Sequence, residues 1–262
     1  MDFKGKAVLI TGASGGMGKA VALRLAQEKC KLALFARREE KLKEIVKNIG
    51  NKTECIYKKC DVTNKKDIKE AVESTYKKFG RIDLAILSAG ILLPNPIETF
   101  DSSIIKNTLD INFLGNVYFI EELFPIMKSQ KSGTIAAVST LPDRRGVPGW
   151  GAYGASKAAL SWLMESLRAE AKQKYNINFI TIKPGSVETP MIKDYHRVGA
   201  TSPEKAAEYI VNGIKRNKKV IQFPFVQVFV TRATDLFPNV VYDKLPIDMQ
   251  KGAGYPEPKE KK

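Results

Sequence analysis

The fold is decided by the stretch Thr11-Gly12-Ala13-Ser14-Gly15-Gly16-Met17-Gly18. This stretch follows a predicted strand over 6–11 and opens a predicted helix over 16–28. Glycines allow a tight turn and bring backbone N–H groups close to a pyrophosphate, while the helix N-terminus adds about half a positive charge. The first strand-to-helix turn is therefore a predicted dinucleotide site. The residues expected to line it are Gly12, Ser14, Gly16, Met17 and Gly18.

Strands and helices alternate along the rest of the chain without a long linker. The further predicted strands span 31–36, 55–60, 82–88, 133–139, 177–183 and 219–223, and the further helices 38–48, 65–79, 107–129, 151–175 and 203–216. This alternation predicts one α/β domain of Rossmann type, with a doubly wound, seven-stranded parallel sheet and helices on both faces. We expect the catalytic domain over 1–225, an apolar extension serving as interface or substrate lid over 226–250, and a flexible tail over 251–262.

The composition excludes several classes of protein. The 262 residues include 43 Lys+Arg and 28 Asp+Glu, a formal net charge of +15. The lysines are scattered and no nucleic-acid reader motif accompanies them, so they indicate a solvated surface rather than a nucleic-acid partner. Three cysteines and the single His196 are too few for a disulfide framework or a zinc site, which favours a reducing cytoplasm and no metal. The apolar stretch 220–230 is too short to span a bilayer.

The residues after the second strand bear on the choice of cofactor. That strand ends at Ala36 and is followed by Arg37 and Arg38. A carboxylate near this strand end commonly accepts from the ribose of cofactors that lack a 2′-phosphate. Here two guanidinium groups stand in its place, and they can chelate a phosphate. The sequence therefore predicts NADP(H).

A tyrosine and a lysine stand four residues apart in a predicted helix. Tyr153 and Lys157 occupy positions i and i+4 of 151–175, so they share one helix face. An unperturbed tyrosine has a pKa of about 10, and a nearby cation favours its phenolate. The pair is a candidate proton donor and acceptor, although isolated pairs with this spacing also recur on helix surfaces by chance.

Several motifs occur together in a characteristic order. They are TGASGGMG at 11–18, LSAG at 87–90, Asn112, the pair Ser139-Thr140, YGASK at 153–157 and PGSVET at 184–189. With this set, the sequence strongly resembles the short-chain dehydrogenase/reductase family over roughly residues 4–225.

The resemblance implies a catalytic tetrad of Asn112, Thr140, Tyr153 and Lys157. Tyr153 would give the proton in reduction and take it in oxidation. Lys157 would hold the nicotinamide ribose and lower the tyrosine pKa, and Asn112 would help hold a water in a proton relay. The further cofactor contacts that it implies are Asp61 and Val62 at adenine, Ala89 and Gly90 by close backbone approach, and Pro184, Gly185, Val187 and Thr189 at nicotinamide.

One member of this tetrad departs from the family pattern. The family places a serine thirteen residues before the tyrosine, where this chain has Thr140, preceded by Ser139. Successive strand residues point to opposite faces, so only one of the two hydroxyls is expected to serve. We favour Thr140, with Ser139 as the alternative.

These features predict an NADP(H)-dependent oxidoreductase of the alcohol dehydrogenase type, which transfers a hydride between nicotinamide and a carbonyl or secondary alcohol. Apolar residues at 92–94, 150 and 191–192 predict an apolar substrate pocket. His196 lies in a loop that covers the substrate in the family, and we expect it to face solvent, with substrate contact as the alternative. Homodimers or homotetramers are implied by the family, through helices 107–129 and 151–175. The alternatives are a regulatory NADP(H)-binding protein without turnover, and a membrane-surface lipid carbonyl reductase suggested by 221–229, 236–241 and the net charge.

Overall fold

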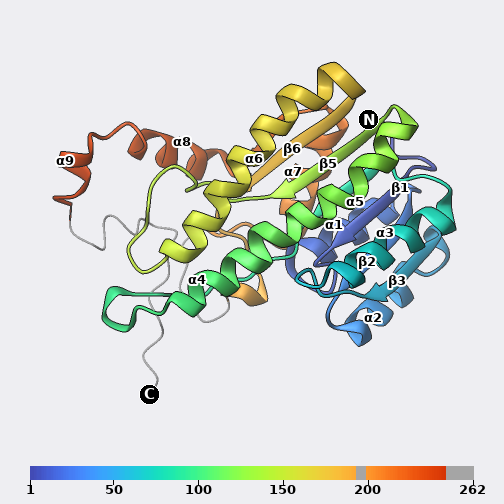
Figure 1. Ribbon diagram of the computed structural model, residues 1–262, viewed down its shortest axis with the longest axis horizontal. Coiled ribbons are helices and arrows are strands. Elements are labelled where there is room, and N and C mark those ends of the chain that lie inside the picture. The colour runs from blue at the N-terminus through green and yellow to red at the C-terminus, as the bar shows by residue number, and fades with distance from the viewer. Residues whose placement is uncertain (193–198, 246–262) are drawn as a thin grey trace.

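Seven short apolar segments form the central sheet of the computed structural model, which describes residues 1–192 and 199–245. The strands are β1 (Ala7–Thr11), β2 (Lys31–Ala36), β3 (Cys55–Lys59), β4 (Leu84–Leu87), β5 (Gly133–Val138), β6 (Ile177–Pro184) and β7 (Val220–Phe223). All neighbouring strands pair in parallel, in the order β3-β2-β1-β4-β5-β6-β7 (Figure 1). Every residue of β1, β4 and β5 is buried, as expected for parallel strands covered on both faces.

The main helices form a layer on each face of the sheet. They are α1 (Gly16–Ala26), α2 (Glu39–Ile49), α3 (Lys65–Phe79), α4 (Ser102–Leu109), α5 (Gly115–Gln130), α6 (Gly151–Tyr175) and α7 (Pro203–Lys215). One core cluster joins the sheet to α1, α2 and α7, and a second joins it to α3, α5 and α6. This is the doubly wound Rossmann-type fold that the alternation predicted, so that prediction is confirmed.

Local sequence signals set the ends of several helices. Asn64 caps α3 by accepting from the backbone N–H groups of Lys66 and Asp67, and Gly80 ends it in the left-handed region with φ +73°. Ser202 caps α7 in the same way by accepting from Lys205. These caps explain why the predicted boundaries of both helices were close to those observed.

The helix expected over 107–129 is longer and less regular than predicted. It begins as α4 at Ser102, passes through a π-helical turn at Asp110–Leu114 and continues as α5 to Gln130. A π-turn inserts one extra residue through an i→i+5 bond, here from the Gly115 N–H to the Asp110 carbonyl. Apolar spacing alone does not distinguish such a turn from a regular helix.

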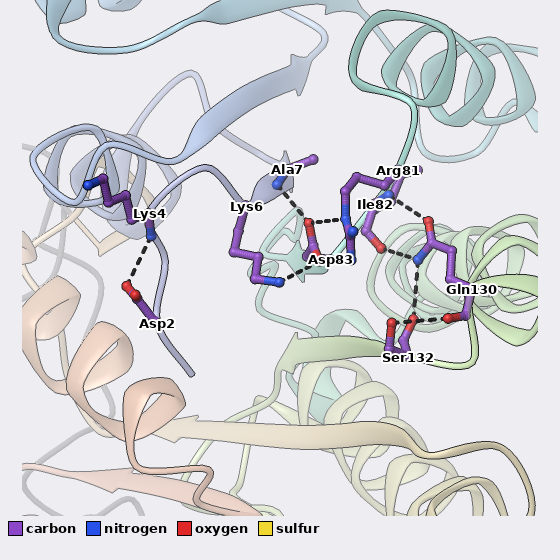
Figure 2. Close-up of polar contacts among 9 residues, drawn as sticks. All are labelled: Asp2, Lys4, Lys6, Ala7, Arg81, Ile82, Asp83, Gln130 and Ser132. Carbon is purple, nitrogen blue, oxygen red and sulfur yellow. Dashed lines mark hydrogen bonds and ion pairs between the residues drawn. The ribbon is translucent and has the colours of Figure 1, made fainter.

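A buried carboxylate lies at the amino-terminal ends of the strands, which we call the amino edge of the sheet; the carboxyl-terminal ends form its carboxyl edge. Asp83 accepts from the Ala7 N–H at 3.0 Å and from Arg81 at 2.6 and 2.9 Å, and Lys6 Nζ lies 3.3 Å away (Figure 2). Beside it, the Gln130 amide donates to the Ile82 carbonyl and accepts from its N–H. These contacts tie the starts of β1 and β4 to the end of α5.

Two helices that the sequence did not predict follow the last strand. They are α8 (Phe225–Thr234) and α9 (Asn239–Tyr242), and both lie away from the sheet in Figure 1. They occupy most of the extension expected over 226–250, whereas 246–250, the tail over 251–262 and His196 lie outside the described residues. Across the described part of the chain, no helix is both long and apolar enough to cross a membrane.

Candidate active site

The glycine loop lies where β1 and β4 end side by side. Gly12 has φ +65°, and a Cβ on it would stand 2.8 Å from the backbone nitrogen of Ala89. Gly18 packs against the Gly12 carbonyl, so α1 begins directly on the loop. Thr11 joins the two strand ends by accepting from the N–H groups of Ser88 and Ala89 at 3.1 and 3.2 Å. The absence of side chains at Gly12 and Gly18 therefore lets the loop pack directly against the backbone of Ala89 and the start of α1, which any side chain at these positions would prevent.

The predicted arginine site lies against the same loop. Arg38 donates from Nη2 and Nε to the Ser14 hydroxyl at 3.1 and 3.3 Å. A Cβ on Gly15 would be 3.0 Å from the same guanidinium. Arg37 and Arg38 are both exposed, and Ser14 is half-buried. The structure thus brings Arg38 and Ser14 together beside the loop.

Asp61 and Val62 follow β3 at the same edge of the sheet. Burial raises the pKa of the Asp61 carboxyl, but hydrogen bonds from Thr63 and the charge of Arg37 outweigh it and leave the pKa below its ordinary value. Val62 packs against Gly115, where a Cβ would meet the valine side chain at 2.9 Å. Asp61 is therefore held as a carboxylate near Arg37, and Val62 connects this strand end to α5.

Tyr153 and Lys157 lie one turn apart in the first half of α6. The Lys157 ammonium stands 5.8 Å from the centroid of the Tyr153 ring and donates to the Val138 carbonyl at 2.7 Å. Lys157 is almost fully buried, and this burial lowers its pKa from 10.5 to about 8. A buried cation beside a phenol is the arrangement that the i, i+4 spacing predicted.

Asn112 sits in the π-turn and joins three parts of the site. Its amide accepts from the Ile91 N–H at 2.8 Å, donates to the Ile91 carbonyl at 2.9 Å and donates to the Ser156 hydroxyl at 3.1 Å. A Cβ on Gly90 would lie 3.1 Å from Asn112 Oδ1 and 3.5 Å from Lys157 Nζ. The π-turn therefore places Asn112 between the loop after β4 and the first half of α6.

The hydroxyls of Ser139 and Thr140 have different surroundings. Ser139 donates to the Lys157 carbonyl at 2.9 Å and lies 2.7 Å from the Ser161 hydroxyl, so it is engaged in packing α6 onto β5. The N–H groups of Ser139 and Leu141 both pair with β6, which keeps the chain extended and turns Thr140 to the opposite side. These contacts favour Thr140 over Ser139 as the hydroxyl available to a substrate.

The segment from Pro184 to Thr189 follows β6 and contacts the glycine loop at Gly16. A Cβ on Gly16 would be 3.1 Å from the Thr189 methyl group. Val187 forms an isolated parallel bridge with Thr201, and Gly185 packs against Gln227 of α8. This segment therefore places Thr189 against the loop that begins α1.

A buried network behind the site was not predicted. Asp143 holds Lys183 at 2.5 Å, accepts from Ser161 at 2.6 Å and lies 3.5 Å from Arg232 of α8. Ser161 also forms a hydrogen bond with the Ser139 hydroxyl at 2.7 Å. The partners come from β6, α6 and α8, and no local pattern relates residues so far apart in sequence.

Comparison with known proteins identifies the family. The model of the short chain dehydrogenase family matches residues 6–198. The chain belongs to the short-chain dehydrogenase family. An uncharacterised oxidoreductase of Listeria monocytogenes is 40% identical over 195 residues, covering 74% of this chain and 79% of the relative. This membership makes the protein an oxidoreductase of that family.

Solved structures agree with this assignment. Levodione reductase superposes with a TM-score of 0.78 at 26% identity, covering 86% of this chain and 98% of the other. A short-chain dehydrogenase/reductase from Burkholderia phymatum, solved in complex with NAD, has a TM-score of 0.82 and covers 98% and 99% of the two chains. At 19% identity the latter likeness shows the fold alone.

Proposed function

We propose that the protein is an NADP(H)-dependent oxidoreductase that interconverts a carbonyl compound and a secondary alcohol. The observation that carries this proposal is the placement of Tyr153 and the buried Lys157 at the sheet edge that also holds the glycine loop. Ligands of open α/β sheets bind at this carboxyl edge.

The glycine loop fits a dinucleotide because it joins β1 directly to the N-terminus of α1, whose backbone N–H groups can donate to a pyrophosphate. The residues proposed to hold the nucleotide are Gly12, Ser14, Gly16, Met17 and Gly18 at the pyrophosphate, Arg37 and Arg38 at a 2′-phosphate, Asp61, Val62, Ala89 and Gly90 at adenosine and the adjoining backbone, and Pro184, Gly185, Val187 and Thr189 at nicotinamide. The Arg38–Ser14 contact supports the preference for NADP(H), since a guanidinium and a hydroxyl can both donate to one phosphate.

When bound, the nicotinamide nucleotide supplies or accepts the hydride. Tyr153 then gives a proton to the carbonyl oxygen in reduction and removes it in oxidation. In its charged form, Lys157 favours the tyrosine phenolate, and its donation to Val138 fixes the amine at this position. Thr140 donates its hydroxyl to the same oxygen and so stabilises the charge that develops there.

Asn112 acts in this proposal through the groups that it holds. Its contacts to Ile91 and Ser156 fix the end of β4 against α6, next to Tyr153 and Lys157. The part in a water relay that the resemblance implies for Asn112 stays a prediction. The proposed substrate is a small apolar carbonyl compound, because Trp150 and Ile192 are apolar and largely buried in the loops that border the site.

The test is turnover of NADPH with a panel of apolar ketones and aldehydes by the purified full chain and by Tyr153→Phe. We expect wild-type turnover on at least one substrate and a loss of about 10³-fold in Tyr153→Phe, with an unchanged melting temperature. Tyr175→Phe, at the other end of α6, is the matched control and should keep its activity. Tight nucleotide binding with no wild-type turnover on any substrate would favour a regulatory protein.

A further inference from the structure

Apolar side chains gather on the outer side of α8 and α9. Eight of the fourteen exposed large hydrophobic side chains among the described residues fall within 225–241. Phe225 and Leu236 are 80% and 83% exposed. We call this surface the α8–α9 face, and it consists of Phe225, Val226, Phe229, Val230, Leu236, Phe237, Val240 and Val241. Exposed apolar residues concentrated in this way mark an interaction surface.

The opposite side of the two helices is fixed to the body of the protein. Gln227 accepts from the Ser186 N–H at 2.8 Å, and Arg232 lies between Asp143 and Asp235. Arg145 stacks over the Tyr242 ring at 4.5 Å. These contacts hold the polar side of α8–α9 inward and so present the apolar side outward. Figure 1 shows both helices projecting past the sheet.

The net charge of the chain favours an anionic lipid surface over a second copy of the protein as the partner of this face. The chain carries a net charge of +15, so a second copy would bring an equal positive charge toward it. Within 225–241 the only carboxylate is Asp235, which is paired with Arg232 at 2.7 Å. Aliphatic and phenylalanine side chains on a cationic protein complement an anionic lipid surface.

We propose that the α8–α9 face docks on an anionic phospholipid bilayer and lies in its surface. The apolar side chains would enter the acyl boundary while the net positive charge attracts the headgroups. Since Gln227 contacts the segment proposed to hold nicotinamide and Arg232 contacts Asp143, docking places the loops of the candidate active site beside the bilayer. Binding to lipid does not depend on the proposed reaction.

The experiment is co-sedimentation of the full chain with vesicles of phosphatidylcholine containing about 30% phosphatidylserine. We expect the wild type to bind, to bind at least tenfold more weakly to pure phosphatidylcholine, and to lose affinity as salt rises from about 0.05 to about 0.5 M. The double variant Phe225→Ser/Phe229→Ser should lose affinity at least tenfold. Trp162→Ser, which removes a 79% exposed side chain from α6, is the matched control and should bind like the wild type.

The second double variant, Leu236→Ser/Val240→Ser, gives the same test if the first does not fold, and circular dichroism checks both. The proposal is wrong if the wild type does not bind the anionic vesicles, or if the folded face variants bind as well as Trp162→Ser. Absence of vesicle binding, together with a wild-type dimer that the face variants convert to monomer, would assign the face to a second copy of this chain.

Discussion

The two edges of the central sheet use polar side chains in opposite ways. At the amino edge, Asp83 and Gln130 pair with backbone and charged groups around the starts of β1 and β4 and hold the strands together. At the carboxyl edge, Gly12 lets the glycine loop pack against the Ala89 backbone, and the buried Lys157 stands beside Tyr153. The same strands thus carry a stabilising cluster at one end and a candidate active site at the other. Substitutions should separate the two. Those at the amino edge should alter unfolding alone, whereas those at the carboxyl edge should alter chemistry, nucleotide binding or the stability of the site.

After Tyr153→Phe, the largest effect is expected at Thr140. Thr140→Val keeps the shape of the side chain and removes the hydroxyl proposed to polarise the substrate oxygen, so kcat should fall on the order of 10²–10³-fold. Ser139→Ala should lower the melting temperature, because it breaks contacts to Lys157 and Ser161, yet change kcat only a few-fold. Steady-state kinetics and thermal unfolding measure both variants. A larger loss of kcat in Ser139→Ala would reverse the assignment.

The next effect is a pH dependence of stability at Lys157. Burial lowers its pKa from 10.5 to about 8, so below pH 8 the folded chain must keep a buried charge. Between pH 8 and 10.5 the folded lysine is neutral while the unfolded one still binds a proton, and stability therefore rises with pH in this window. The free energy of unfolding of wild type minus that of Lys157→Met should increase by about 3 kcal/mol across it.

Taking the difference from Lys157→Met cancels the other groups that titrate at alkaline pH. Urea unfolding of both proteins at several pH values measures it. If the difference in free energy of unfolding stays constant between pH 8 and 10.5, Lys157 titrates near its ordinary pKa. Burial would then not destabilise its charged form.

A smaller effect is expected at the amino edge. Asp83→Ala leaves the buried Ala7 N–H without its partner and removes the carboxylate that Arg81 and Lys6 contact, so the free energy of unfolding should fall by about 2 kcal/mol. The value of kcat/KM should stay within about twofold, because the substitution lies at the edge opposite the site. Asp2→Ala, which removes an exposed carboxylate that accepts from the Lys4 N–H (Figure 2), is the control.

The smallest effect is expected at Arg38. Arg38→Gln removes one charged donor from the proposed 2′-phosphate position, so the Kd for NADPH should rise about tenfold while that for NADH stays unchanged. Arg168→Gln, which loses a contact to the Lys219 carbonyl far from the glycine loop, should alter neither. Fluorescence titration compares the three proteins. Equal losses for both nucleotides in Arg38→Gln would remove the arginine from 2′-phosphate recognition.

Much of the fold follows from local pattern. The seven buried strands are short apolar runs separated by helices of amphipathic period, and parallel pairing with right-handed crossovers then leaves few topologies. The glycine loop and the pair Tyr153 and Lys157 were also predictable, because each lies within one turn or one junction. Their gathering at one edge follows from the parallel direction of the strands.

What the sequence did not reveal depends on contacts between distant segments. The π-turn at Asp110–Leu114 has the same apolar spacing as a regular helix. Helix α8 was read as an apolar extension, since FVQVFV is rich in valine and phenylalanine and its helical form is held by tertiary partners of Gln227 and Arg232. The Asp143 network joins segments that only the folded chain brings together.

The most direct test of the account is titration of the purified full chain with NADPH and with NADH, followed by nicotinamide fluorescence. The carboxyl edge is proposed to be a nucleotide site with Arg38 at the 2′-phosphate, so NADPH should bind saturably and at least about tenfold more tightly than NADH. Tighter binding of NADH would contradict the cofactor assignment. Failure of either nucleotide to bind would contradict the proposed site as a whole.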